Sequence, residues 1–312
     1  MHKTESLKFR KRELRKKRFL NYISYFKNPF VIIVGLYIGF ACISYIGAFY
    51  MAIITSLKSL NNFSDDLLGF PRKLMYENYL RAFANLYIMQ QTDMGSRRVT
   101  FFELLKNSVM ISTLPVFFTV FSRALVAYVV AKYQKFRFNK VLHFFVVFVI
   151  VFPSAGSLGA TISFLKLMGL YDSYFALILG TIGFADSTFL MWYGAWKGIP
   201  SEYMEAARID GAGHWQTYFS VMFPLIRVQF LIFLALNFID YWNDYSRSLT
   251  TMPSYPNLAL GLWKFQFSTT NIISWPPVQM AAVVLVALPC IIVFLIVQPH
   301  LEGNIKSGGL KG

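Results

Sequence analysis

Isolated charges within long apolar stretches are the first residues of this 312-residue chain that could do chemistry. Arg123 and Asp186 both lie in such stretches, where an ionisable side chain often marks a functional site. The same two side chains could instead pair to hold a helix bundle together, or extend to a membrane interface. We favour this structural interpretation over the functional one.

No residue pattern predicts catalysis or metal binding by the chain. The sequence has no phosphate-binding loop and no recognisable nucleophile–base pattern. The histidines, which could ligate a metal, are scattered over separate segments: His2, His143, His214 and His300. Gly180 and Gly183 lie in an apolar run, which is typical of close helix packing. We therefore expect that the chain is not an enzyme and holds no metal or cofactor of its own.

A polar, helix-prone segment at 197–224 separates two strongly apolar stretches. Pro200 and Ser201 lie near its start, and Ser201 offers an N-cap hydroxyl. Glu202 and Glu205 follow in the early turns, where carboxylates interact favourably with the helix dipole. Gly211 should end this helix because glycine accepts the positive φ of a C-terminal cap.

A second helical run is predicted to begin near His214, and Pro224 marks the return to apolar sequence. The segment therefore reads as a helix, a tight bend and a second helix outside the bilayer. This shape suits docking onto a partner.

The composition predicts an integral membrane protein. Hydrophobic residues make up 56% of the chain and charged residues only 14%, and the mean hydropathy is +0.48; soluble domains carry about 25% charge. The net charge is +15, and ten Lys and Arg lie within residues 1–27 against Glu5 and Glu13. Such a basic leader is typical of a cytoplasmic segment, whereas a nucleic-acid-binding arm is the competing interpretation. Cys42 and Cys290 lie in apolar runs, so no disulfide framework is implied.

Six apolar stretches predict six transmembrane helices with both termini in the cytoplasm. They are residues 29–57, 101–131, about 141–165, about 173–196, 227–240 and 278–297. The fifth is the weakest, because only twelve uncharged residues separate Arg227 from Asp240. The chain then divides into a basic leader (1–28), the first span (29–57), an extracytoplasmic segment (58–100), a core (101–299) and a cytoplasmic tail (300–312).

The polar segment contains a spaced motif that resembles the coupling loop of ABC importer permeases. The matching residues are Glu205, Ala206, Ala207, Gly211 and Pro224. Val221 and Phe223 stand where that family usually has Ile and Leu, which keeps the apolar character. In the family this loop sits in a cleft of the ATP-binding subunit; the alternative is an amphipathic surface loop that merely connects two spans.

Further motifs narrow the resemblance to the smaller membrane subunit of maltose-type importers, over roughly residues 75–312. These are Asn107-Ser108, Trp242-Asn243-Asp244, Leu260-Gly261-Leu262 and the glycine-containing end at 309–312. The resemblance implies an all-α membrane protein with six transmembrane helices, the type I ABC importer permease fold and cytoplasmic coupling helices. It also implies a multi-pass location in the bacterial inner membrane.

The resemblance further implies the partners. They would be a second permease subunit, two ATPase subunits that bind the ATP, an extracytoplasmic solute-binding protein, a sugar substrate and membrane lipid, with no nucleic acid. The coupling surface would comprise Glu205, Ala206, Ala207, Asp210, Gly211 and Pro224.

Two weaker sets of site residues follow from the same resemblance. Trp263, Phe265 and Trp275 lie in a predicted outer loop at 246–277 and could contact the binding protein or a sugar ring. The predicted substrate path contains Asn237, Asp240, Trp242 and Asn243. The alternative for the polar members of this set is that they mark the outer end of the fifth span and interact with water.

These patterns favour a permease subunit of an ABC importer for oligosaccharides or related sugars. Two other classes stay open. One is an ion-coupled secondary transporter that uses Asp186 or Asp240 as a proton site. The other is a membrane assembly or sensor protein without a transport path.

Overall fold

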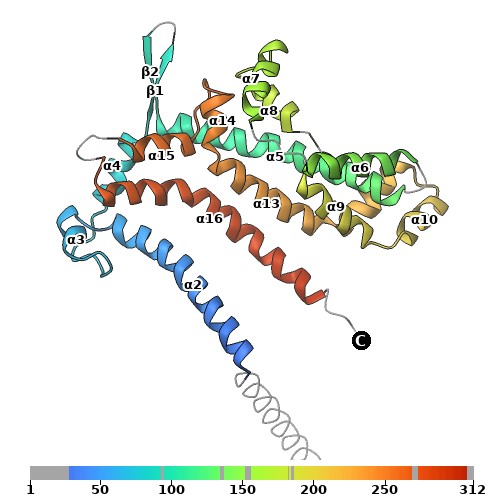
Figure 1. The fold of residues 1–312 in the computed structure, drawn as a ribbon, viewed down its shortest axis with the longest axis horizontal. Coiled ribbons are helices and arrows are strands. Elements are labelled where there is room, and N and C mark those ends of the chain that lie inside the picture. The colour runs from blue at the N-terminus through green and yellow to red at the C-terminus, as the bar shows by residue number, and fades with distance from the viewer. Residues whose placement is uncertain are drawn as a thin grey trace, which may run out of the picture.

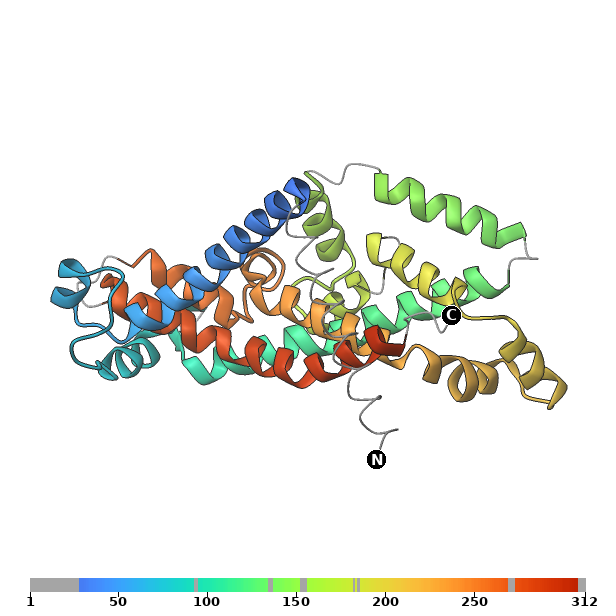
Figure 2. The same ribbon diagram turned by 90° about the horizontal axis from the view of Figure 1, so that it is seen from below.

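Helices dominate the computed structural model, which describes residues 28–92, 95–133, 137–151, 156–181, 183, 186–268 and 273–307 (Figure 1). The predicted leader up to residue 27 and the end of the predicted tail, residues 308–312, lie outside the described residues. The helices are α2 (Pro29–Ser56), α3 (Leu60–Asp65), α4 (Glu77–Asn85), α5 (Phe101–Lys132), α6 (Arg137–Val151), α7 (Ser157–Leu167), α8 (Tyr174–Thr181), α9 (Ser187–Lys197), α10 (Glu202–Ile209), α11 (His214–Gln216), the π-helix η1 (Thr217–Met222), α12 (Phe223–Leu225), α13 (Arg227–Asn243), α14 (Tyr245–Thr250), α15 (Leu258–Gln266) and α16 (Pro276–Ser307). Figures 1 and 2 place α10 at one end of an elongated molecule, and α3 and α4 at the other.

Three described helices are long and apolar enough to cross a membrane: α2, α5 and the Pro276–His300 part of α16. They coincide with the first, second and sixth predicted spans. α2 starts where the Asn28 side chain accepts a hydrogen bond from the Phe30 amide at 3.0 Å. Its buried residues are confined to the last turn, from Ile54 onward. The rest of this apolar helix is exposed, as a lipid-facing helix is.

The middle spans are less regular than predicted. The third stretch forms α6 and α7, and the fourth forms α8 and α9. The fifth is α13, which meets the helical run His214–Leu225 at a bend of 77°. That pair would add a fourth crossing if it acts as one span, so the count of six stays a prediction.

The described chain is mostly helical, as predicted, but the segment 58–100 contains a β-hairpin that the all-α prediction did not include. Strands β1 (Ile88–Thr92) and β2 (Gly95–Val99) pair antiparallel, from Ile88 opposite Val99 to Thr92 opposite Gly95. The hairpin projects from the bundle (Figure 1). Its base residues, Ile88 and Val99, are buried in a hydrophobic core and anchor it, whereas the polar remainder offered little strand signal in the sequence.

α5 is the central helix of the fold. It packs against α8, α9, α13 and α15, and its Pro115 is accommodated inside the helix. A first core of α5, α9, the η1 region and α13 contains the fully buried Trp192 and Trp196. The indole of Trp196 donates a hydrogen bond to the Ala124 carbonyl of α5 at 2.8 Å, which satisfies its buried N–H.

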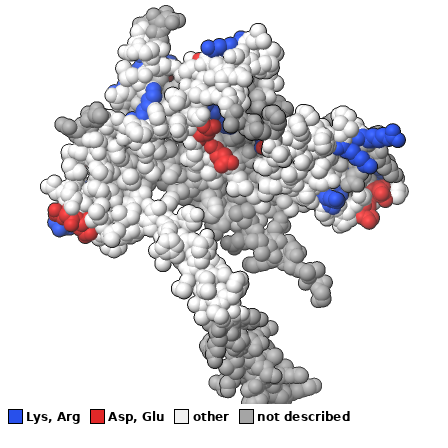
Figure 3. All heavy atoms as spheres, in the orientation of Figure 1, with Lys and Arg blue, Asp and Glu red and all other residues white. Residues whose placement is uncertain are grey.

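A second core lies towards the other end of α5 and joins it to α4, α15 and α16. Charged side chains are sparse along the body of the molecule. On the face shown in Figure 3 they gather mainly at the two ends and around the projecting elements, with a broad uncharged surface between. The end formed by α6 and α10 carries both signs of charge.

Candidate functional site

The elbow, residues 197–224, is the helix–bend–helix that the sequence predicted. α10 ends in a Schellman motif: the Gly211 amide donates to the Arg208 carbonyl at 3.0 Å and the Ala212 amide to the Ala207 carbonyl at 2.9 Å. Gly211 has a φ of +83°, so the positive φ predicted from its residue type is confirmed. α11 begins at His214, also as predicted.

One local prediction at the elbow is wrong. Ser201 stands at the N-cap of α10, but its side chain makes no capping hydrogen bond, and its backbone is already helical with φ −74° and ψ −17°. A capping side chain needs an extended backbone to reach back to the helix amides. The first turn is held by its backbone instead, since the Ser201 carbonyl accepts from the Met204 and Glu205 amides.

Most of the predicted coupling residues are accessible. Glu205, Ala206, Asp210, Gly211 and Pro224 are exposed, whereas Ala207 is buried on the opposite face of α10 together with Met204. Two apolar side chains stand out on the elbow surface: Ile209 is 86% exposed and Trp215 is 64% exposed. Apolar and acidic groups side by side at a protruding bend form a surface suited to a protein partner.

The elbow is tied to the end of α5. The Lys132 ammonium donates to the Ile199 carbonyl, and the Tyr133 hydroxyl bonds to His214 Nδ1 at 2.8 Å. The Tyr128 hydroxyl donates to the Met204 sulfur at 3.6 Å. These three side-chain bonds connect the elbow to the last turns of α5, and the 77° bend connects it to α13.

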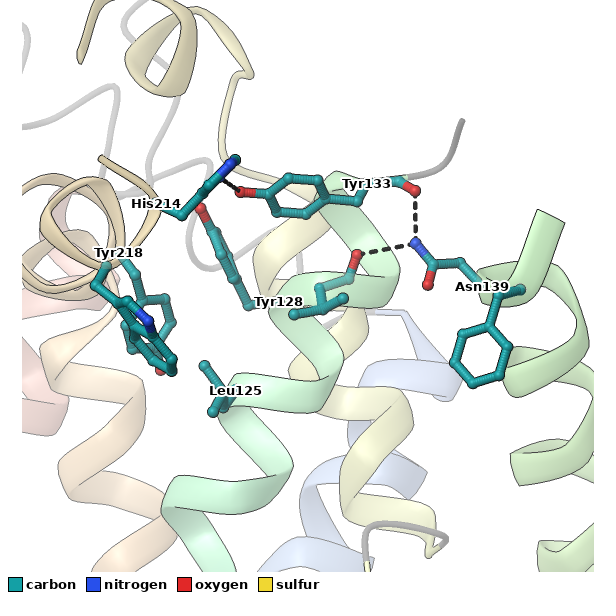
Figure 4. A pocket seen from close by; sticks show the side chains of 9 residues that line it. Leu125, Tyr128, Tyr133, Asn139, His214 and Tyr218 are labelled. Atoms are coloured by element: carbon teal, nitrogen blue, oxygen red, sulfur yellow. Dashed lines mark hydrogen bonds between the residues drawn. The ribbon is translucent and has the colours of Figure 1, made fainter. Parts of the chain in front are cut away.

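A cavity of about 520 Å³ lies behind the elbow, between the last turns of α5, the start of α6 and the α11–η1 run (Figure 4). Figure 4 shows the Tyr133–His214 bond closing one side, and Asn139 of α6 bridging to carbonyls of α5. Most of the other lining groups are aromatic rings and aliphatic side chains.

A polar cluster joins three helices inside the bundle. Arg123 of α5 pairs with Asp186 at 2.7 Å and also reaches Thr188 at 3.2 Å and Asn237 of α13 at 3.4 Å. Asp186 caps α9 by accepting from the Thr188 and Phe189 amides. The predicted pairing of Arg123 with Asp186 is therefore confirmed.

The four predicted path residues do not come together as one site. Asn237, 8% exposed, belongs to the Arg123 cluster. Trp242 is buried in the second core, where its indole donates to the Val286 carbonyl at 3.0 Å, so it acts in packing. Asp240 and Asn243 are exposed, and the Asn243 amide bonds to the Ile239 carbonyl of its own helix.

The three residues predicted to contact the binding protein also differ in how exposed they are. Phe265 is only 5% exposed and packs in the second core, which leaves it no free aromatic face in this structure. Trp263 is half-buried and stacks on Tyr245 with ring centroids 5.4 Å apart. Trp275 is also half-buried, with the Arg81 guanidinium 5.5 Å from its ring centroid. These two remain candidates for an outer contact.

Side chains at the start of α5 hold the segment that precedes α15. The Asn107 amide donates to the Pro256 carbonyl at 2.9 Å, and the Ser108 hydroxyl accepts from the Leu258 amide at 2.7 Å. Reasoning from the residues missed one nearby group, Arg247, whose guanidinium lies 3.7 Å from the Tyr241 ring centroid and pairs with Asp244 at 3.3 Å. In the sequence, the Asp-x-x-Arg spacing of Asp244 and Arg247 is the pattern that could have indicated this pair.

Among the described residues, no three His, Cys, Asp or Glu side chains form a group that could hold a metal ion.

Comparisons with known proteins agree with this arrangement. A family model described as a binding-protein-dependent transport system inner membrane component matches residues 108–307. A probable starch degradation products transport system permease of Thermoanaerobacterium thermosulfurigenes is 25% identical over 86% of this chain and 92% of its own length. A trehalose/maltose transport system permease of Thermococcus litoralis is 28% identical over 86% and 95%.

A solved structure has the same fold. It belongs to a bacterial ABC transporter involved in the import of the acidic polysaccharide alginate, and the two chains superpose with a TM-score of 0.70 at 20% sequence identity. The superposition covers 86% of this chain and 95% of the other.

Proposed function

The chain belongs to the family of binding-protein-dependent transport system inner membrane components, and from this premise we propose that it is a permease subunit of an ABC importer for oligosaccharides or related sugars. Relatives along most of its length are described as permeases for starch degradation products and for trehalose and maltose. Another, from Bacillus subtilis, is described as an import permease for melibiose, raffinose and stachyose. The substrate class follows from these descriptions.

The observation that carries the mechanism is the protruding elbow with its exposed Glu205 and Ala206. Ala206 is small enough to let α10 approach a cleft closely, and the Glu205 carboxylate can pair with a cation there. ATP binding and hydrolysis belong to two partner ATPase subunits in this proposal, and this chain needs no cofactor.

Movement of the elbow would reach the bundle through two connections. The bonds of Lys132 and Tyr133 join it to α5, and Arg123 joins α5 to α9 and α13. ATP-driven closure of the ATPase dimer would thus rock these helices together from inward-facing to outward-facing. A second permease would form the other half of the path, and a solute-binding protein would release sugar into the outer opening.

The proposal places the chain in the bacterial inner membrane as a multi-pass protein with both termini in the cytoplasm. The elbow and the basic residues at the start of α6 would then share the cytoplasmic side, in agreement with the positive-inside rule.

Glu205→Lys in the assembled transporter tests the coupling role. We expect the complex to assemble, while sugar uptake per ATP hydrolysed falls, because the reversed charge repels the cation that receives Glu205. Asp65→Lys, an exposed acid at the end of α3 at the far end of the molecule, is the matched control and should transport as wild type. Normal uptake by Glu205→Lys would show that the elbow does not couple through this residue.

A further inference from the structure

The cavity behind the elbow is chemically unlike a sugar site. Its polar side chains are already satisfied within the protein: the Asn139 amide donates to the Val129 and Tyr133 carbonyls, and Tyr133 bonds to His214. What remains is an aromatic and aliphatic interior, to which Leu125, Val129 and Phe138 contribute. A hydroxyl-rich ligand would lose hydrogen bonds to water on entering it, whereas an apolar chain would gain free energy.

One lining group nevertheless lacks a partner. Tyr218 is 1% exposed, and its hydroxyl makes no hydrogen bond to any described residue. The hydroxyl oxygen itself is fully buried, so a molecule in the cavity does not reach it. The accessible interior therefore favours an apolar chain.

The cations around the cavity indicate the charge of this molecule. The Arg208 guanidinium lies 5.4 Å from the ring centroid of Tyr133, a lining residue. Arg137 and Lys140 flank the lining residues Phe138 and Asn139 in sequence and are exposed. None of these three cations forms an ion pair within the part of the chain that the structure describes. Lys140 also lines a second, smaller cavity of about 270 Å³ that shares Asn139 with the first.

We propose that this cavity binds one anionic glycerophospholipid, with an acyl chain inside and the phosphate among Arg208, Arg137 and Lys140. The location agrees, because the cavity opens beside the last turns of α5, one of the helices long enough to cross the membrane. Basic pockets at the cytoplasmic ends of transmembrane helices bind anionic headgroups. The bound lipid joins α5 and α6 to α11, so it stiffens the base of the elbow.

Native mass spectrometry of the purified full chain tests this, with dioleoyl phosphatidylglycerol and dioleoyl phosphatidylcholine titrated in parallel. We expect the wild type to retain phosphatidylglycerol more strongly. Arg208→Gln should weaken phosphatidylglycerol binding about fivefold, the effect of one interfacial cation, and leave phosphatidylcholine unchanged. Arg72→Gln, an exposed arginine beyond α3, is the matched control and should change neither lipid.

Two variants test the interior. Leu125→Trp, at a half-buried lining position, and Phe138→Trp, at an exposed one, should both narrow the cavity and reduce binding of either lipid. Thermal unfolding of each variant distinguishes a filled cavity from an unfolded chain.

Equal retention of the two lipids by the wild type would overturn the proposal, because the cavity would then be only an apolar recess. Undiminished phosphatidylglycerol binding by folded Phe138→Trp would overturn it too, because the lipid would lie elsewhere. No retained lipid at all would also overturn the proposal. None of these measurements depends on transport. A negative result would therefore contradict the lipid site without contradicting the proposed function.

Discussion

Arg123 Nη2 of α5 lies 2.7 Å from Asp186 Oδ2 at the start of α9, and this ion pair connects the central helix to its neighbour. The pair is partly shielded, with 13% of the arginine side chain and 34% of the aspartate side chain exposed. The guanidinium also donates to Thr188, Asn237 and the Gly183 carbonyl, so one side chain connects three helices.

Removing the guanidinium should destabilise the bundle. We expect Arg123→Met to lower the free energy of unfolding by about 2 kcal/mol, because the partly buried Asp186 carboxylate loses its cation. Arg123→Lys should recover only part of this, because an ammonium cannot reproduce the planar fork. Thermal unfolding in a mild detergent measures both. Arg72→Lys, at an exposed surface pair, is the control and should be neutral.

The same residues discriminate between transport mechanisms. If Asp186 were a proton site, Asp186→Asn would abolish sugar uptake. Uptake by the wild type would also stop when the proton gradient is collapsed. We expect uptake that depends on ATP and persists without the gradient. A loss of stability in Asp186→Asn without loss of ATP dependence would agree with the structural role.

Elements that carry a strong local sequence pattern are the ones that the sequence predicts best. The ends of the elbow helices followed from Gly211 and His214, and α2, α5 and α16 followed from unbroken apolar runs. Pairing of Arg123 with Asp186 could be inferred because charges inside apolar sequence need a partner. None of these inferences required knowledge of distant contacts.

Features set by distant contacts were not predictable. The hairpin depends on Ile88 and Val99 reaching a core formed by α4, α15 and α16, which no local pattern shows. The resemblance predicts Phe265 as a binding-protein contact and Trp242 as part of the substrate path, but it says nothing of how these side chains pack. Their burial depends on how α15 and α13 pack against α16, which is tertiary information.

The Asp66 turn should respond to acid. Asp66 Oδ1 accepts from the Gly69 amide at 2.8 Å and the Leu68 amide at 3.2 Å. The bond from Gly69, assisted by the Lys58 charge, lowers the pKa of this carboxyl below its ordinary value of 3.8. A lowered folded-state pKa means that the stabilisation is complete above the ordinary value and is lost as the pH falls through the folded one.

Hydrogen exchange of the peptide spanning 66–72 measures this effect. We expect the wild type to lose protection relative to Asp66→Asn as the pH falls below about 4, because the asparagine side-chain oxygen accepts the same bonds without titrating. Comparing the two at each pH cancels the intrinsic pH dependence of exchange. An identical decline in both proteins would show that the carboxyl does not hold this turn.

Two glycines of the elbow provide a matched pair of variants. Gly211 has a φ of +83° and a Cβ added there would meet no atom within 4 Å, so only its backbone conformation resists substitution. Gly213 has an ordinary φ of −70° at the start of α11 and is equally open. Alanine should therefore cost about 1 kcal/mol at position 211 and almost nothing at 213.

The consequence for function follows from the position of the bend. Strain at Gly211→Ala should loosen the turn between α10 and α11, and with it the connection from the exposed Glu205 surface to α5. We expect more ATP hydrolysed per sugar imported in Gly211→Ala than in Gly213→Ala, measured on reconstituted transporter. Because the two variants add the same methyl group two residues apart, equal coupling ratios would mean that the fixed angle of the elbow does not transmit the movement.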